Sequence, residues 1–219
     1  MEQPILLLAH RYEVYLNGLI YGLESENYEI GKVVRSGIDA LHYVIEKRPT
    51  LAILDTELPV LSAFDIIKTA TEKGVKTKFV LIFPDAQQEY LVVSRSLNAA
   101  GTVLVSDSFD AISRCIDNVI KGITCFSSGF SNNSMMSIDT TLSYIDLLSE
   151  TERQILFFIG KEKNSVQMAE MLGTSKRTVE KHRSNIIAKL KLDKKTNSLV
   201  HWVYKNRKLV STLHDGATY

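Results

Sequence analysis

The sequence MAEMLGTSKRTVEKHRSNIIAKL, residues 168–190, has the pattern of two helices joined by a short turn. A glycine and a threonine at 173–174 form the turn. After the turn, apolar side chains recur with the period of a helix, so that Val179, Ile186 and Leu190 share one face. Another face gathers Arg177, Lys181, Ser184 and Ala188. A helix, a short turn and a longer basic helix together predict a helix-turn-helix.

The neighbouring segments extend this unit on both sides. LSETERQIL, residues 148–156, opens with a capping box, in which the Ser149 side chain bonds backbone amides and Glu152 returns the bond. We therefore expect a helix to begin there. A last helix, at roughly 197–206, is expected to be capped by Thr196. Its apolar residues are Leu199, Val200, Trp202 and Val203.

Residues 148–210 resemble the LuxR-type DNA-binding domain of the NarL/FixJ subfamily of response regulators, through LSETERQIL, MAEMLGTSKRTVEKHRSNIIAKL and KKTNSLVHWV. The resemblance implies binding of double-stranded DNA in the major groove. It also implies a homodimer that meets the two half-sites of an inverted repeat. The last helix would form the dimer contact, although Trp202 could equally be ordinary core.

Seven residues take the positions at which the family meets DNA. By the family pattern, Glu180, Lys181 and Ser184 face base edges in the major groove. Glu180 could accept a hydrogen bond from cytosine N4, and Lys181 could donate to guanine O6 or N7. For Glu180 and Arg183, a solvated helix position remains an alternative. The residues placed for phosphates are Lys176, Arg177, Thr178 and Arg183.

The distribution of charge separates the two ends of the chain. Residues 149–210 hold 14 Lys and Arg against 6 Asp and Glu, whereas residues 1–148 hold 12 against 18. A polyanion would be attracted by the basic part and repelled by the acidic part. We therefore expect only the C-terminal part to meet nucleic acid.

Residues 1–121 alternate short apolar runs with amphipathic runs. The apolar runs predict five buried strands, at 5–9, 28–34, 51–55, 79–83 and 102–105. The amphipathic runs predict helices at 13–23, 38–47, 62–73, 86–98 and 110–122. This order predicts an α/β fold, a doubly wound, flavodoxin-like parallel sheet of five strands. Ligands of such sheets bind at the carboxyl ends of the strands.

The same residues resemble the receiver domain of response regulators. Asp55, at the end of the third strand and followed by Pro59, takes the position of the phosphoacceptor aspartate. Other positions depart from the family pattern, which makes the receiver atypical. The family's two acidic Mg²⁺ ligands, its Ser or Thr and its Lys correspond here to His10, Arg11, Phe83 and Val105.

Loss of the acidic pair has a chemical consequence. Phosphoryl transfer to a carboxylate needs a divalent cation, and Mg²⁺ requires oxygen ligands that imidazole and guanidinium do not provide. Our hypothesis is that Arg11, with or without His10, places a fixed positive charge beside Asp55 and replaces the cation. The alternative is that Arg11 points to solvent and Asp55 is merely a turn residue at the end of a strand.

These observations predict a receiver domain at 1–121, a linker at 122–147, a DNA-binding domain at 148–210 and a tail at 211–219. The linker is rich in Ser, Asn, Thr and Gly. With 45% apolar residues, no membrane-spanning run, no signal peptide and two cysteines, we expect a cytoplasmic protein without membrane contact.

No paired carboxylates, metal-ligand cluster or phosphate loop marks the chain as an enzyme, and no cofactor is expected. Three functions stay open. The first is a DNA-binding regulator independent of phosphorylation, constitutive or controlled by a protein or small ligand on the receiver. The second is a regulator controlled by phosphorylation of Asp55. The third is a protein-interaction module. The basic helix favours the first two, and the altered pocket favours the first.

Overall fold

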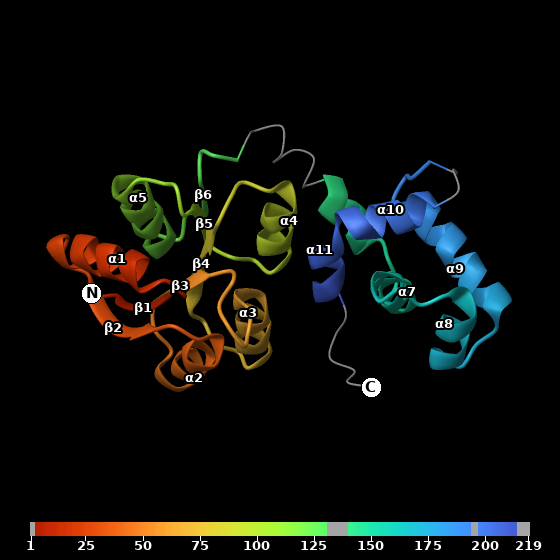
Figure 1. Ribbon diagram of the computed structural model, residues 1–219, viewed down its shortest axis with the longest axis horizontal. Helices are drawn as coiled ribbons and strands as arrows, with labels where there is room; N and C mark the ends of the chain where they lie inside the picture. The colour runs from red at the N-terminus through yellow and green to blue at the C-terminus, as the bar shows by residue number, and fades with distance from the viewer. Residues whose placement is uncertain (1–2, 131–139, 194–196, 214–219) are drawn as a thin grey trace. The chain divides into compact units, whose positions relative to one another are not determined.

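The computed structural model describes residues 3–130, 140–193 and 197–213. The chain divides into two compact units, one mainly within residues 1–131 and the other mainly within residues 132–219. Figure 1 labels the helices and strands of each unit. Within the described ranges, no helix is long and apolar enough to cross a membrane.

The first unit is built on a parallel sheet with the strand order β2-β1-β3-β4-β5-β6. Its strands are β1 Ile5–Ala9, β2 Glu29–Val34, β3 Leu51–Asp55, β4 Lys78–Phe83, β5 Gly101–Leu104 and β6 Cys125–Phe126. The five predicted strands are confirmed, with boundaries that differ by at most one residue. The central strands are mostly apolar because helices cover both faces of the sheet.

The sixth strand corrects the prediction of a five-stranded sheet. β6 pairs with β5 in parallel register, with Cys125 opposite Gly101. The amide of Ser127 continues this pairing by donating to the carbonyl of Thr102 at 2.8 Å. The predicted linker at 122–147 therefore contains a short strand near its start. Two residues are too few to show a strand pattern in the sequence.

Five helices flank the sheet: α1 Glu13–Ser25, α2 Gly37–Lys47, α3 Ala63–Glu72, α4 Gln88–Ser96 and α5 Phe109–Ile120. Serine side chains cap α2, α3 and α5 at their first backbone amides. α1 and α5 cover the same face of the sheet (Figure 1), where their apolar side chains form one buried core with alternate strand residues. The amino ends of α1, α3 and α5 therefore lie near the carboxyl ends of the strands.

The second unit is helical, with α7 Glu150–Gly160, α8 Ser165–Met171, α9 Lys176–Lys189, α10 Ser198–Lys205 and α11 Arg207–Thr212. Residues 140–146 are also helical. The predicted capping box of α7 is present, and the predicted turn at 173–174 separates α8 from α9. The prediction of a helical helix-turn-helix unit is confirmed.

The end of the chain differs from the prediction in two respects. α11 continues the unit beyond the expected four helices and packs against α7, so residues 211–212 belong to a helix and not to a tail. The predicted cap Thr196 lies outside the described residues. α10 begins after Asn197, which makes no side-chain capping bond.

Candidate nucleic-acid interface and the Asp55 pocket

Helix α9 has one buried side and one exposed side, as its sequence predicted. Val179, Ile186 and Leu190 are buried in the second unit. Ser175 caps the helix by accepting a hydrogen bond from the amide of Thr178 at 3.1 Å. Burial of three apolar residues on one side fixes which side chains α9 presents to solvent.

The exposed side of α9 carries five of the seven predicted contact residues, namely Lys176, Arg177, Glu180, Lys181 and Ser184. Thr178 is half-buried, and its hydroxyl lies 2.8 Å from that of Ser175. The hydroxyl of Ser184 donates to the carbonyl of Glu180 at 3.0 Å, which holds that side chain against its own helix.

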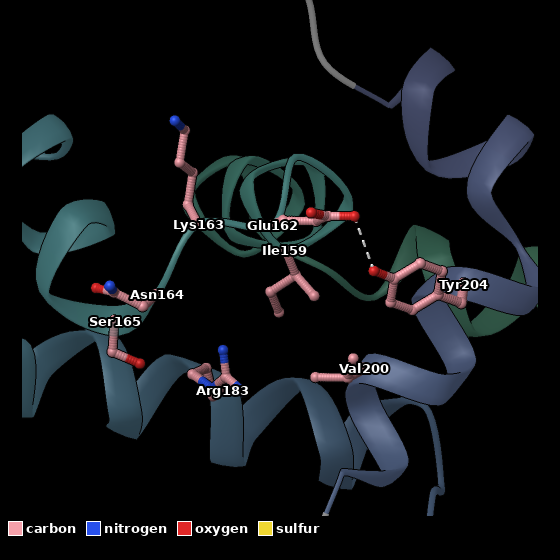
Figure 2. A pocket seen from close by; sticks show the side chains of 8 residues that line it. All are labelled: Ile159, Glu162, Lys163, Asn164, Ser165, Arg183, Val200 and Tyr204. Carbon is pink, nitrogen blue, oxygen red and sulfur yellow. Dashed lines mark hydrogen bonds between the residues drawn. The ribbon is translucent and has the colours of Figure 1, made fainter.

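Arg183 lies apart from this exposed row. Its side chain is 23% exposed, and its Nε lies 3.7 Å from the Glu180 carboxylate. Figure 2 shows Arg183 from α9 and Ile159 from α7 pointing into a pocket of about 420 Å³. Tyr204 of α10 closes one side of this pocket, because its hydroxyl donates to Glu162 at 3.0 Å.

A buried ion pair fixes α9 to the start of α7. Glu152 is 2% exposed, accepts a hydrogen bond from the amide of Ser149, and receives another from Nζ of Lys189 at 2.7 Å. Burial works to raise the pKa of Glu152, but the bonds from Lys189 and Ser149 outweigh it and lower that pKa. The capping pattern predicted only the local role of Glu152, and no signal in the sequence indicated its link to Lys189.

The second site lies at the carboxyl ends of β1 and β3. Asp55 is 1% exposed, and its two carboxylate oxygens accept hydrogen bonds from the amides of Arg11 at 3.3 Å and Glu57 at 2.9 Å. Nε of Arg11 lies 3.6 Å from Oδ2 of Asp55. The guanidinium also forms an ion pair with the Glu57 carboxylate, a partner that the sequence analysis missed.

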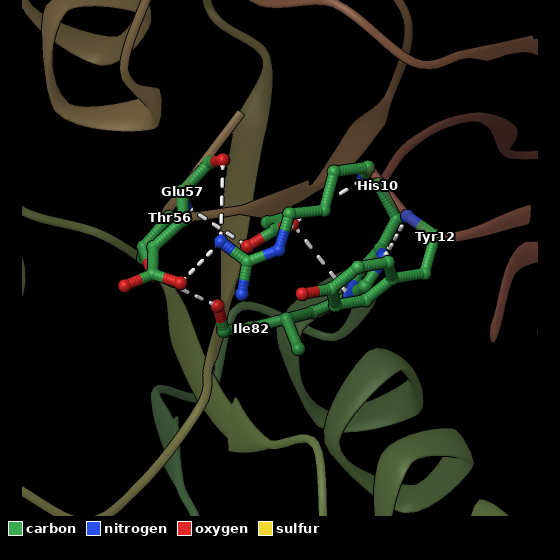
Figure 3. A network of polar contacts seen from close by, with 7 residues as sticks. His10, Tyr12, Thr56, Glu57 and Ile82 are labelled. Atoms are coloured by element: carbon green, nitrogen blue, oxygen red, sulfur yellow. Dashed lines mark hydrogen bonds and ion pairs between the residues drawn. The ribbon is translucent and has the colours of Figure 1, made fainter. Parts of the chain in front are cut away.

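His10 is also buried beside the same carboxylate. Its Nδ1 accepts a hydrogen bond from the amide of Tyr12 at 3.0 Å, as Figure 3 shows, so a neutral imidazole carries its proton on Nε2. Nε2 lies 3.7 Å from Oδ2 of Asp55. Burial lowers the pKa of His10 despite the opposing attraction of Asp55. At neutral pH the positive charge beside Asp55 therefore belongs to Arg11.

The other two predicted pocket residues have different surroundings. Phe83 is fully buried at the end of β4 and packs near the rings of Phe64 and Phe130. Val105 follows β5 and is 38% exposed. The structure thus brings His10 and Arg11 to Asp55. Phe83 places an apolar ring at the end of β4.

Comparison with known proteins defines the class to which these two units correspond. Residues 146–202 match the family described as bacterial regulatory proteins, luxR family. The second unit therefore contains a LuxR-type helix-turn-helix, and most of the chain has homologues among transcriptional response regulators.

Among the relatives, the transcriptional regulatory protein MctR of Rhizobium johnstonii is 29% identical, over 86% of this chain and 89% of that protein. The oxygen regulatory protein NreC of Staphylococcus epidermidis is 27% identical, over 84% of this chain and 89% of that protein. The RcsB structure from Salmonella enterica serovar Typhimurium, bound to promoter P1flhDC with the phosphomimetic BeF3⁻, has a TM-score of 0.60. It is 15% identical and covers 93% of this chain and 99% of that chain, which supports the fold.

Proposed function

We propose that this protein is a sequence-specific DNA-binding transcription regulator that inserts α9 into the major groove. The observation that carries this proposal is the exposed row on α9, in which Lys176, Arg177 and Lys181 are free to meet a polyanion. A helix of this size fits the major groove, and lysine or arginine at its exposed face can donate to phosphates and to guanine.

We also propose that the regulator works without phosphorylation of Asp55. The carboxylate is buried and already accepts two backbone hydrogen bonds, so a phosphodonor has little access to it. Arg11 and His10 occupy the positions from which acidic side chains would hold Mg²⁺, and they offer nitrogen atoms instead of oxygen ligands. The nearby guanidinium supports the idea that a fixed charge replaces the cation.

Double-stranded DNA is therefore the proposed partner, bound by a homodimer at an inverted repeat. RcsB, a structural neighbour of this chain, has been observed as two dimers bound to two parallel DNAs. The domain limits predicted from the sequence were 1–121 for the receiver and 148–210 for the DNA-binding domain, and β6 suggests that the first domain extends at least to residue 126. α11 suggests that the second domain extends to residue 212.

Selection from a pool of random duplexes tests the DNA-binding proposal. The wild-type chain should enrich an inverted repeat, and Lys181→Ala should bind that repeat about tenfold more weakly, because one base contact contributes roughly 1–3 kcal/mol. Lys163→Ala is the matched control, since Lys163 is exposed in the same unit but not on α9. Failure to enrich any sequence, or equal binding by Lys181→Ala and wild type, would contradict the proposal.

A further inference from the structure

A groove of about 500 Å³ lies between α1 and α5 within the first unit. Its walls are aromatic and aliphatic, formed by Tyr12, Val14, Tyr15, Gly18, Leu19, Asp107, Phe109 and Ile112. Two apolar side chains on the outer face of α1 are strongly exposed, Val14 at 86% and Tyr21 at 81%. Apolar surface of this kind on a folded unit often marks a binding site.

Two glycines one helical turn apart show what the groove can accept. The ring of Phe109 lies directly on Gly22, where a Cβ atom would approach within 2.3 Å of the ring. At Gly18, no atom lies within 4 Å of the position that a Cβ would occupy. Gly22 is therefore covered by an aromatic ring, whereas Gly18 leaves a similar notch open. A flat ring is the shape that fits this notch.

The polar groups of the groove favour a positively charged ligand. Asp107 is the only charged residue among those that line it. Its two oxygens accept bonds from the Leu104 amide and the Ser127 hydroxyl, and each oxygen keeps a further lone pair. The hydroxyl of Tyr15 is buried and has no hydrogen-bond partner in the described part of the chain. Burial, with the charge of Asp107, raises the pKa of Tyr15 to about 12, so the phenol stays neutral.

The charges of the two helices favour a cationic occupant. α1 contains Glu13 and Glu24 but no basic residue, and α5 contains two aspartates and one arginine, Arg114. With four acidic residues against one arginine, the two helices together carry a net negative charge, which attracts a cation.

We propose that the α1–α5 groove binds a small aromatic molecule that carries a protonated amine. The ring lies on Gly18 between Tyr12 and Phe109, and the ammonium group donates hydrogen bonds to the Asp107 carboxylate. Aromatic walls add cation–π attraction to this ion pair. The groove belongs to the first unit, whereas α9 belongs to the second.

Ring contacts connect this groove to the Asp55 pocket. Tyr15 stacks on the imidazole of His10, with ring centres 4.3 Å apart. The guanidinium of Arg11 lies over the ring of Tyr12 at 4.7 Å. A ligand that touches both tyrosines therefore changes the environment of the two side chains that surround Asp55. This connection supplies a specific readout, the NMR signals of the His10 ring.

The test uses tryptamine, with tryptophol and indole-3-propionate as neutral and anionic analogues, titrated into the isotope-labelled full chain. Tryptamine should bind saturably, shift the His10 ring signals, and bind at least tenfold more tightly than indole-3-propionate. Asp107→Asn should reduce this preference about tenfold, which corresponds to about 1.4 kcal/mol. Asparagine keeps an oxygen for the Leu104 amide.

Gly18→Leu should fill the notch and weaken tryptamine binding more than tenfold. Asn17→Leu is the control, because it adds the same side chain at an exposed position outside the groove lining, and it should leave tryptamine binding unchanged. Leucine favours a helix more than glycine or asparagine does, so both variants should fold, as circular dichroism can verify. Equal binding of the three indoles, or none, overturns the proposal. The proposal is also overturned if the wild-type chain sediments as a dimer and Gly18→Leu sediments as a monomer. The groove would then be an interface between two copies of the chain.

Discussion

Replacing Lys189 with methionine should destabilise the second unit by removing the cation from a buried carboxylate. Glu152 is 2% exposed and receives the Lys189 ammonium at 2.7 Å. Loss of one partner of a fully buried pair costs about 3–5 kcal/mol. Here the side chain of Lys189 is 36% exposed and Glu152 keeps the bond from the Ser149 amide, so the expected loss is about 2 kcal/mol. For a unit of this size, that loss lowers the melting temperature by roughly 8–16 °C.

Trp202 provides the assay. It is the single tryptophan of the chain and lies on α10, so its fluorescence during urea unfolding reports on the second unit. Lys163→Met serves as the control, because Lys163 is exposed and its replacement should change the free energy of unfolding by less than about 0.5 kcal/mol. If Lys189→Met and Lys163→Met have equal midpoints, the ion pair does not stabilise the unit.

The pH dependence of the difference in free energy of unfolding between wild type and Lys189→Met gives a second check. The pKa of Glu152 is lowered in the folded state, so the unfolded chain takes up the proton first as the pH falls. The stabilisation is fully present above the unfolded value of about 4.3 and is lost as the pH falls through the folded value. The gap between wild type and Lys189→Met should therefore close in acid, and a gap that persists there would refute the reasoning.

Three further predictions concern single residues. Arg11→Met should destabilise the first unit by about 2 kcal/mol in urea unfolding followed by circular dichroism, because Asp55 loses its nearby guanidinium; an unchanged midpoint would mean that Arg11 does not compensate the buried charge. The lowered pKa of His10 predicts that stability of this unit falls as the pH drops below the unfolded value of about 6.5, and His10→Gln should lack that decrease. Ser175→Ala should cost about 1 kcal/mol by Trp202 fluorescence, because α9 loses its cap, whereas the exposed Asn185→Ala should cost nothing.

Much of the fold could be predicted because its elements have strong local patterns. The central strands are buried on both faces and are mostly apolar, and the turn at 173–174 and the capping box of α7 are marked by residue type. β6 and α11 lack such signals. β6 is held by backbone pairing with β5, and α11 is a six-residue helix that immediately follows α10.

The candidate sites were predictable where periodicity or strand ends decide the positions of residues. The period of α9 placed Lys181 on its exposed side, and the shared carboxyl edge of the sheet placed Arg11 beside Asp55. Contacts between distant residues were not predictable. Glu152 and Lys189 are 37 positions apart, and their pairing depends on how α7 packs on α9. The Arg11–Glu57 pair depends likewise on the approach of β1 to β3.

The central claim is that the chain recognises DNA through α9 without phosphorylation of Asp55. The most direct measurement is the affinity for the selected repeat, with and without acetyl phosphate and Mg²⁺, for wild type and Asp55→Asn. We predict that wild type binds equally well in both conditions, that its intact mass gains no phosphoryl group, and that Asp55→Asn binds within about twofold. Binding that appears only after phosphodonor treatment, and is lost in Asp55→Asn, would contradict the account.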